Sequence, residues 1–454
     1  MVQGPAPADL VVEPHHAPAW RVPKASPPQG DKRAPLRTAL ERHGFLGPKQ
    51  LAGRNFPMGC VALEITQRCN LDCTLCYLSE NAEVTLDPPL EEVFRRIDMI
   101  AEHYGPLVTV QVTGGDPTLR DADDLVAIVE RLRAKGLRSA LFTNGIKATR
   151  PLMTRLAKAG LTDVSLHVDM TQERKGYDSE LALNAVRAEY LDRVRGLGIN
   201  VIFNTTVFDA NLADIPALVE WFKSRADEIH MVSFNLEAQT GRGTQGGTAV
   251  DIPAVITAVN QAMGVGLDFD TPNLGHPECN RYSSVLIAGG RVTPIFDTEP
   301  KLFERLFRHF AHLRPDRRSW ASMWGVVGQG FLTKPVAAVS MLPGLIRLGL
   351  RLAPGYVRSG RRMTKLSFYI HNFMDAQALE PARCEACIFQ VMTHQGPISM
   401  CVHNADRDHF VRAAYDTSEG RFDPRADATL SLKSAKGKTR RQLLEGRRRV
   451  QAAE

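Results

Sequence analysis

The fold is decided by residues 61–77, which read VALEITQRCNLDCTLCY. The first five residues are apolar apart from one glutamate, and such a short apolar run is typical of a buried strand. The strand pattern leads directly into a loop that carries Cys69, Cys73 and Cys76 with the spacing C-x3-C-x2-C. Three thiols this close in sequence are better suited to binding metal than to forming disulfides in a reducing compartment. The stretch therefore joins a buried strand to a candidate metal loop.

Five further strand patterns follow this one along the chain. They are residues 107–113, 139–143, 164–168, 200–207 and 229–235. Between them lie stretches whose apolar residues recur three and four positions apart, which predicts helices. Helical crossovers between successive strands indicate parallel pairing. We therefore expect an α/β fold with reactive groups at the carboxyl ends of six parallel strands.

The cysteine loop can hold an iron–sulfur cluster. Three thiolates can bind three irons of a [4Fe-4S] cube, which leaves the fourth iron open to another ligand. A structural zinc ion is the alternative, but it normally has four protein ligands, and this loop carries neither a fourth cysteine nor a histidine. The cluster is therefore the favoured interpretation.

This loop, with Tyr77 directly after its last cysteine, resembles the radical S-adenosylmethionine (SAM) superfamily. The resemblance implies a partial (β/α)6 barrel in which Cys69, Cys73 and Cys76 hold a catalytic [4Fe-4S] cluster. It also implies that SAM binds the open iron and that an electron from the cluster cleaves SAM to a 5′-deoxyadenosyl radical. The electron would come from a reductant such as flavodoxin or ferredoxin.

A second motif follows the second strand pattern, where residues 113–118 read TGGDPT. It looks like the GGEP motif of the same superfamily with aspartate in place of glutamate. Gly114 and Gly115 would let the backbone approach SAM closely, and Asp116 would accept a hydrogen bond from its ammonium group. A plain Gly-Asp-Pro turn is the alternative.

Polar residues also lie at the ends of the later strand patterns. By analogy with the superfamily, Asp169 and Asn204 are candidates for contact with SAM, although a polar residue in such a place can also face solvent or cap a helix. His167 is interpreted as a core histidine with satisfied hydrogen bonds. No catalytic acid or base is assigned.

Four more cysteines follow the barrel at Cys279, Cys384, Cys387 and Cys401. Four thiolates are enough to close a site, either a fully ligated iron–sulfur cluster or a four-cysteine zinc site. We expect a second [4Fe-4S] cluster that serves electron transfer or substrate placement. The alternative is that Cys279 and Cys401 are buried apolar residues. Cys60 is expected to be structural.

The segments around these cysteines resemble the C-terminal pattern of the archaeal tetraether lipid synthase group of radical SAM enzymes. The matching stretches are HPEC at 276–279, NFMDA at 372–376 and CVHN at 401–404, with Phe234 and Gly241-Arg242 in the sixth-strand region. The resemblance implies hydrogen abstraction from a lipid chain, followed by C–C bond formation or another alkyl modification. A peptide maturase, or an enzyme that methylates a pterin or another small molecule, is the enzymatic alternative. The non-enzyme alternative is an interaction protein whose fold is stabilised by bound metal and which docks on membranes.

Residues 317–374 form a basic, apolar insertion with nine Lys and Arg but no Asp or Glu. Single arginines between aliphatic blocks are expected of helices that lie in an anionic membrane interface. A core helix pair with arginines at its edges is the alternative. Nucleic acid is disfavoured, because the basic residues alternate with aliphatic rather than aromatic ones.

Composition sets the class of the chain and its expected location. The 454 residues are 44% hydrophobic and 23% charged with a net charge of +6, which fits a folded globular protein rather than a disordered or collagen-like one. The apolar stretches are interrupted by Gly, Pro and Arg before they reach membrane-spanning length. We therefore expect a cytoplasmic protein, with peripheral contact to the inner membrane face through the insertion.

The same patterns divide the chain into six segments. They are a Pro-rich disordered arm with a short helix near Leu36–His43 (1–57), the radical SAM barrel (58–245), the barrel end with Cys279 (246–316), the insertion (317–374), the auxiliary cluster segment (375–415) and a basic flexible tail (416–454).

Overall fold

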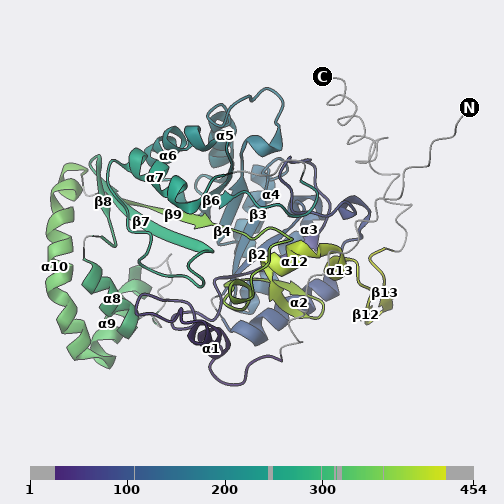
Figure 1. Ribbon diagram of the computed structural model, residues 1–454, viewed down its shortest axis with the longest axis horizontal. Helices are drawn as coiled ribbons and strands as arrows, with labels where there is room; N and C mark the ends of the chain where they lie inside the picture. The colour runs from purple at the N-terminus through teal and green to yellow at the C-terminus, as the bar shows by residue number, and fades with distance from the viewer. Residues whose placement is uncertain are drawn as a thin grey trace, which may run out of the picture.

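The strand that precedes the cysteine loop, β1 (Cys60–Thr66), is the third strand from one edge of an eleven-stranded sheet in the computed structural model. Figure 1 shows this sheet at the centre of the molecule, with helices packed around it. The structure describes residues 26–106, 108–243, 249–297, 299–310, 313, 320–360 and 362–425.

The six predicted strands are confirmed, and they are parallel neighbours in chain order. After β1 they are β2 (Thr109–Gly114), β3 (Arg138–Thr143), β4 (Asp163–His167), β5 (Asn200–Val207) and β6 (Ile229–Leu236). The crossover helices are α2 (Leu90–Tyr104), α3 (Ala122–Ala134), α4 (Arg150–Ala159), α5 (Asn184–Val194) and α6 (Ile215–Ser224). The α/β class and the radical SAM type of barrel are therefore as predicted.

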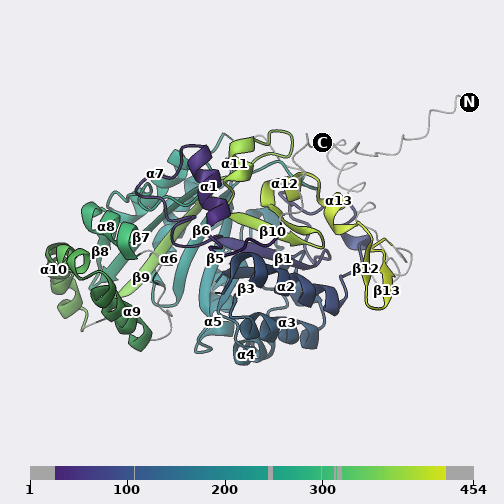
Figure 2. The same ribbon diagram turned by 90° about the horizontal axis from the view of Figure 1, so that it is seen from below.

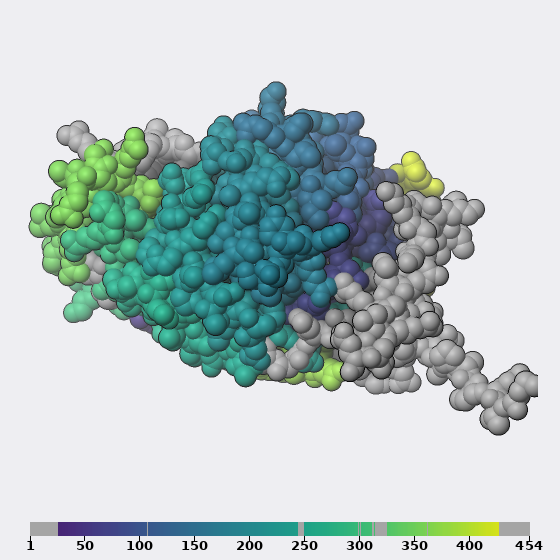
Figure 3. Space-filling model, turned by 90° about the horizontal axis from the view of Figure 1, so that it is seen from above, coloured from purple at the N-terminus to yellow at the C-terminus, as the bar shows by residue number. Residues whose placement is uncertain are grey.

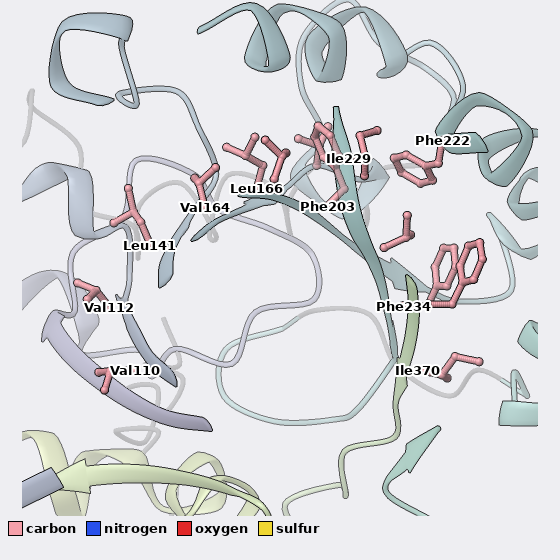
Figure 4. Packing of buried hydrophobic residues seen from close by; sticks show 14 of the residues in the cluster. Val110, Val112, Leu141, Val164, Leu166, Phe203, Phe222, Ile229, Phe234 and Ile370 are labelled. Atoms are coloured by element: carbon pink, nitrogen blue, oxygen red, sulfur yellow. The ribbon is translucent and has the colours of Figure 1, made fainter. Parts of the chain in front are cut away.

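Side chains alternate between the two faces of the curved sheet. Apolar residues such as Val112, Val164 and Phe203 are buried on the convex side against the helices, as Figure 4 shows. Alternate positions such as Ser165 and Asn204 carry buried polar side chains on the concave side. The sheet therefore has an apolar outer layer that holds the helices and a polar inner face.

Five strands of this sheet lie outside the six that the sequence predicted. β9 (Thr364–His371) pairs parallel with β6, and the antiparallel strands β7 (Asn280–Ala288) and β8 (Arg291–Pro294) continue from it. At the other side, β10 (Phe389–Thr393) pairs parallel with β1 and antiparallel with β11 (Gly396–Ser399). Segments from the last third of the chain thus close both sides of the barrel.

The prediction of a disordered arm at residues 1–57 is wrong for the part that the structure describes. The short helix predicted near Leu36–His43 is present as α1 (Ala34–Arg42), and its Leu36 and Leu40 are buried in the main core rather than lying in a disordered arm. The spacing of four residues places both leucines on one face of the helix. Residues 1–25 lie outside the described residues.

Two other segment boundaries need correction. The predicted insertion includes β9, which belongs to the central sheet, and the predicted flexible tail includes the hairpin of β12 (Tyr415–Thr417) and β13 (Gly420–Phe422). The rest of that tail, 426–454, lies outside the described residues. The remaining helices are α7 (Ile252–Met263), α8 (Pro300–Phe310), α9 (Trp320–Thr333), α10 (Pro335–Arg358), α11 (Pro381–Glu385), α12 (Met400–Ala405) and α13 (Arg407–Val411).

Helix α10 corrects the expectation that no apolar stretch reaches membrane-spanning length. It runs unbroken for 24 residues through Pro343 and Pro354, and by length and composition it could cross a bilayer. In Figures 1 and 2 the helix lies at one end of the molecule, and Figure 3 shows this segment at the surface. The sequence-based expectation failed because glycine and proline interrupted the pattern without ending the helix.

Candidate active site

The three loop cysteines lie together just beyond the carboxyl end of β1. All three are free thiols and partly buried. Burial is the main cause that raises the pKa of Cys69 to about 12, and the nearby negative charges of Asp116 and Cys76 act in the same direction. The pKa of Cys73 is raised for the same reason, with added effects from Cys76 and Asp169. Side chains from the ends of β1, β2 and β4 therefore meet here.

Gly114 and Gly115 hold the start of the cysteine loop against the end of β2. A Cβ atom on Gly114 would lie 1.9 Å from the Thr66 carbonyl oxygen, and one on Gly115 would lie 2.0 Å from that of Arg68. The Gly115 N–H donates to Thr66 O at 2.9 Å. Only glycine allows this approach of two backbones, so both glycines have a packing role in addition to their predicted role in SAM binding.

The Asp116 carboxylate is almost fully buried and already accepts several hydrogen bonds. Its donors are the backbone N–H groups of Thr118 and Asn144, each at 2.9 Å, and the Thr143 hydroxyl at 2.8 Å. These bonds tie the end of β2 to the end of β3. Asp116 is thus a positioning group in the structure, which is a different role from the predicted contact with an ammonium group.

Asn144, beyond the end of β3, extends this network to the cysteine loop. Its side-chain amide donates to Asn70 Oδ1 at 2.7 Å and lies 3.9 Å from Cys69 Sγ. Asn144 comes directly after the predicted strand at residues 139–143. The structure shows that it connects Asp116 to the residues around the first cysteine.

Asp169 and Asn204 both lie at the sheet, where their side chains form hydrogen bonds with neighbouring residues of the protein. Asp169 is fully buried and accepts from the backbone N–H groups of Thr171 at 3.0 Å and Thr206 at 2.8 Å. The Asn204 amide donates to Ser165 Oγ at 2.7 Å on the concave face. Their direct contact with SAM remains a prediction.

His167 is not the core histidine that the sequence suggested. Its ring pairs with Asp169 at 2.5 Å, but 36% of its side chain is exposed, so it lines the open concave side. Burial among the surrounding elements lowers the pKa of His167, but the charge of Asp169 outweighs that effect and the pKa is raised. The His167 side chain can therefore carry a positive charge close to the cysteine loop.

Arg242 is a residue whose role the sequence did not reveal. Its side chain is fully buried beyond β6, where it hydrogen-bonds to Cys76 and lies 3.2 Å from Glu83. Its backbone N–H donates to Leu78 O at 2.7 Å. Burial lowers the pKa of Arg242, but the negative charge of Cys76 outweighs this and raises it. A cation is therefore fixed beside one thiol of the loop.

The C-terminal segment also reaches the cysteine loop, through Arg407 of α13. Its guanidinium stacks on the Tyr77 ring at 4.6 Å and forms an ion pair with Glu64 of β1 at 2.5 Å. The Tyr77 hydroxyl in turn donates to Gly114 O at 2.6 Å. The charged residue inside an otherwise apolar strand pattern was the available sequence signal for a buried partner of Glu64.

The second group of cysteines is brought together from three segments, one of which carries both Cys384 and Cys387. Cys279 precedes β7, Cys384 lies in α11, Cys387 precedes β10 and Cys401 lies in α12. Burial raises the pKa of Cys401, and the negative charges of the other three contribute to the same shift. All four thiols are free and electrostatically coupled. The buried Cys60 lies near this group, because Cys387 contributes to its raised pKa.

Hydrogen-bond donors surround these thiols. Arg383 Nε donates to Cys279 Sγ at 3.2 Å, and the backbone N–H groups of Phe389 and Met374 approach Cys387 and Cys401 at 3.4 and 3.5 Å. Donors to sulfur stabilise thiolates and tune the potentials of iron–sulfur clusters. The surroundings of the second group therefore fit a cluster.

Comparison with known proteins identifies the class. Residues 63–222 match the model of the radical SAM superfamily. The chain is 24% identical over 232 residues to a 7,8-dihydro-6-hydroxymethylpterin dimethyltransferase of Methanocaldococcus jannaschii, which covers 46% of this chain and 45% of that protein. It is 30% identical over 183 residues to a PqqA peptide cyclase of Xanthomonas euvesicatoria, covering 37% and 46% respectively. The chain thus spans about half the length of these curated relatives.

A likeness to solved structures is also found. Streptococcus suis SuiB bound to SAM aligns over 50% of this chain and 47% of its own, with 16% identity and a TM-score of 0.35.

Residues 63–222 therefore match a radical SAM domain, in which Cys69, Cys73 and Cys76 would hold a [4Fe-4S] cluster that binds SAM. The prediction made from the cysteine loop is confirmed at the level of the superfamily.

Proposed function

We propose that this protein cleaves SAM reductively and abstracts a hydrogen atom from an unactivated C–H bond of its substrate. The observation that carries the proposal is the convergence of Cys69, Cys73 and Cys76 beside the buried Arg242 at the carboxyl ends of the strands. When bound, SAM and the reduced cluster would supply a 5′-deoxyadenosyl radical, which takes one hydrogen atom to give 5′-deoxyadenosine, with methionine as the other product. The one electron would come from flavodoxin or ferredoxin.

The residues of the chain would prepare the site for this reaction. The three thiolates would hold the cluster, while Gly114, Gly115 and the Asp116 network keep the loop in place. The buried Asp169 lies near Cys73, and its partner His167 is partly exposed on the concave side, where SAM and substrate would meet. The surrounding barrel would keep water from the reactive carbon.

Reconstitution tests the activity. Protein loaded with iron and sulfide under anaerobic conditions, then given dithionite and SAM, should form 5′-deoxyadenosine. Cys73→Ala should form none, whereas Cys60→Ala should retain the activity because Cys60 lies outside the loop. A wild-type protein with a verified cluster that releases no 5′-deoxyadenosine would contradict the proposal.

The second group, Cys279, Cys384, Cys387 and Cys401, would hold a second [4Fe-4S] cluster. Its support is the convergence of three segments and the N–H donors to sulfur. Cys387→Ala should lower the iron content by about four atoms per chain and leave the SAM-binding cluster in place. Zinc bound in place of iron, or an unchanged iron content, would refute the second cluster.

A lipid chain is the proposed substrate, and the products would carry a new C–C bond or another alkyl modification. The support is the exposed apolar side of α10, together with the resemblance of the C-terminal segments to the tetraether lipid synthase group. Mass spectrometry of lipids from cells with and without the protein tests this. A change in lipid structure is expected, and an unchanged lipid profile would contradict a lipid substrate.

A peptide or a small heterocycle such as a pterin is the second candidate. The concave face carries polar residues such as Ser165, Asn204 and Ser233, which suit a polar substrate. Relatives of the chain include a pterin dimethyltransferase and a peptide cyclase by name. Untargeted metabolite and peptide analysis of the same cells would identify this outcome.

A further inference from the structure

Helix α10 has one side that no other part of the described structure covers. The side consists of large aliphatic residues at helical spacing, and we call it the outer face: Val336, Val339, Leu342, Ile346, Leu350 and Val357. Val336, Ile346, Leu350 and Val357 are 83%, 60%, 68% and 71% exposed. Scattered exposed aliphatic residues are common, but a continuous row over six turns of one helix marks an interaction surface.

The opposite side of α10 is fixed to the body of the protein. A Cβ atom on Gly355 would lie 2.8 Å from the Ala288 carbonyl oxygen, and one on Gly344 would lie 3.1 Å from Leu302. Ala338 and Met341 are buried in a small core with Leu302 and Phe310 of α8. Small residues therefore set which side of α10 packs inward, and the outer face must point away from the protein.

An ion pair reinforces this rotation of the helix. Arg347 donates two hydrogen bonds to the Glu299 carboxylate, at 2.6 and 2.8 Å. Because the Arg347 side chain is 57% exposed, the pair adds little stability, but its two-pronged geometry is specific. Arg347, Arg351 and Arg358 share the border between the outer face and the packed side, as their spacing of four and seven residues requires.

Charge identifies the kind of partner. Between residues 317 and 374 the sequence contains no Asp or Glu, so the arginine border is not offset by acids of the same segment. A hollow of about 480 Å³ at the start of α10 is lined by His309, Lys334, Pro335, Val336, Ala337 and Ser340. An apolar row flanked by cations matches the layering of an anionic bilayer, with acyl chains beside phosphate groups.

The attachment of α10 determines how it would meet the bilayer. The helix is long enough to span, but spanning would require its glycine side to leave α8 and β7. Pro343 and Pro354 also have no N–H to donate to the carbonyl groups four residues earlier. Water at the membrane interface can hydrogen-bond to these carbonyl groups, whereas hydrocarbon cannot. Both features favour a helix that lies in the plane of the interface.

We propose that the outer face of α10 docks the protein on an anionic lipid bilayer, with the helix lying parallel to the membrane surface and its arginines at the level of the phosphates. Peripheral binding of this kind is independent of SAM chemistry and goes beyond it. It would bring the barrel close to membrane-borne molecules on the inner face of the membrane.

Vesicle flotation with the full-length chain tests the proposal. The probes are phosphatidylcholine vesicles with and without phosphatidylglycerol, and the variant is Ile346→Glu/Leu350→Glu. The wild type should float with the anionic vesicles, and the double variant should bind at least tenfold more weakly. The control is Lys158→Glu on α4, which lowers the net charge by the same two units. It should bind as the wild type does, because only Ile346→Glu/Leu350→Glu removes apolar side chains from the outer face.

Each other outcome has a defined meaning. Equal binding of wild type and double variant, or no binding by the wild type, would overturn the proposal. A dimer in light scattering that the double variant converts to a monomer, without vesicle binding, would show that a second copy covers the outer face. Retention on vesicles after a carbonate wash would overturn the in-plane orientation. Formation of 5′-deoxyadenosine, measured without lipid, reports separately on the proposed chemistry.

Discussion

At the scale of single residues, the cysteines and the glycines were accessible from the sequence, whereas the groups that support them were not. Cys69, Cys73 and Cys76 are adjacent along the chain, so their spacing alone indicated a shared metal site. Arg242 and Arg407 reach the loop from segments that are distant in sequence. A spacing pattern carries no information about such contacts, because folding alone brings the partners together.

Arg242→Gln should make the cluster harder to reduce. The change removes a buried positive charge that hydrogen-bonds to Cys76, so the reduced and more negative state loses stabilisation. We expect the reduction potential to fall by roughly tens of millivolts, measured by redox titration with EPR detection. Arg242→Lys keeps the charge and should shift it less, and the surface variant Arg225→Gln should not shift it. An unchanged potential at full iron content in Arg242→Gln would contradict this role.

Gly115→Ala should weaken the packing of the cysteine loop against the end of β2. Its Cβ would lie 2.0 Å from the Arg68 carbonyl oxygen, so the backbone must move. We expect a loss of about 1 to 3 kcal/mol in the free energy of unfolding, together with reduced iron loading. Gly266→Ala is the matched control, because a Cβ there meets no atom within 4 Å. Equal stability and iron content for both variants would show that the loop tolerates the displacement.

At the scale of elements, the six parallel strands were predictable because each combines an apolar run with a following helix pattern. β9 and β10 were missed for a different reason. Each pairs with a strand, β6 or β1, that lies far away in the sequence. β9 also directly follows the long basic segment, so its apolar strand pattern was assigned to the insertion. Local periodicity can reveal a strand, but it cannot reveal which distant strand completes its hydrogen bonds.

Helix α12 brings His403 to Glu64 of β1, and this contact should make stability depend on pH. Burial lowers the pKa of His403 to about 4, whereas the unfolded residue titrates near about 6.5. The unfolded chain therefore binds the proton first, and stability should fall as pH drops from about 6.5 toward 4, by up to roughly 1 kcal/mol per pH unit. Urea unfolding of the reconstituted protein from about pH 7.5 to about pH 5.5 measures this slope.

His403→Phe is the test variant for this pH dependence. Phenylalanine keeps an aromatic ring beside Phe410, which lies 5.3 Å from the histidine ring, but it cannot titrate. The slope over this pH range should become shallower, whereas His409→Phe at a neighbouring position should leave it unchanged. Equal slopes in wild type and His403→Phe would assign the pH dependence to other groups.

At the scale of the whole molecule, the barrel is completed by the C-terminal part of the chain. β10 covers the edge of β1, and Arg407 contacts both Glu64 and Tyr77. The same part supplies Cys384, Cys387 and Cys401 to the second group. The two sets of cysteines therefore share one folded body, although the sequence shows them as separate segments.

A chain that ends at residue 379 should be poorly soluble. It lacks β10 and Arg407, so the hydrogen-bonding edge of β1 is open to other chains. We expect most of it in the pellet after ultracentrifugation, with soluble protein regained when residues 380–454 are co-expressed. A soluble fragment that unfolds cooperatively by itself would show that the barrel does not need the C-terminal part.

The pairing of β10 with β1 has a consequence for biogenesis. The strand that leads into the first cysteine motif emerges from the ribosome well before its neighbour on one side, which is translated more than 300 residues later. Until then, β1 has no paired strand on that edge of the nascent sheet, and the cysteine loop lacks its contact with Arg407. Delivery of iron and sulfide to the loop should therefore follow synthesis of β10 and Arg407 rather than accompany synthesis of the loop itself.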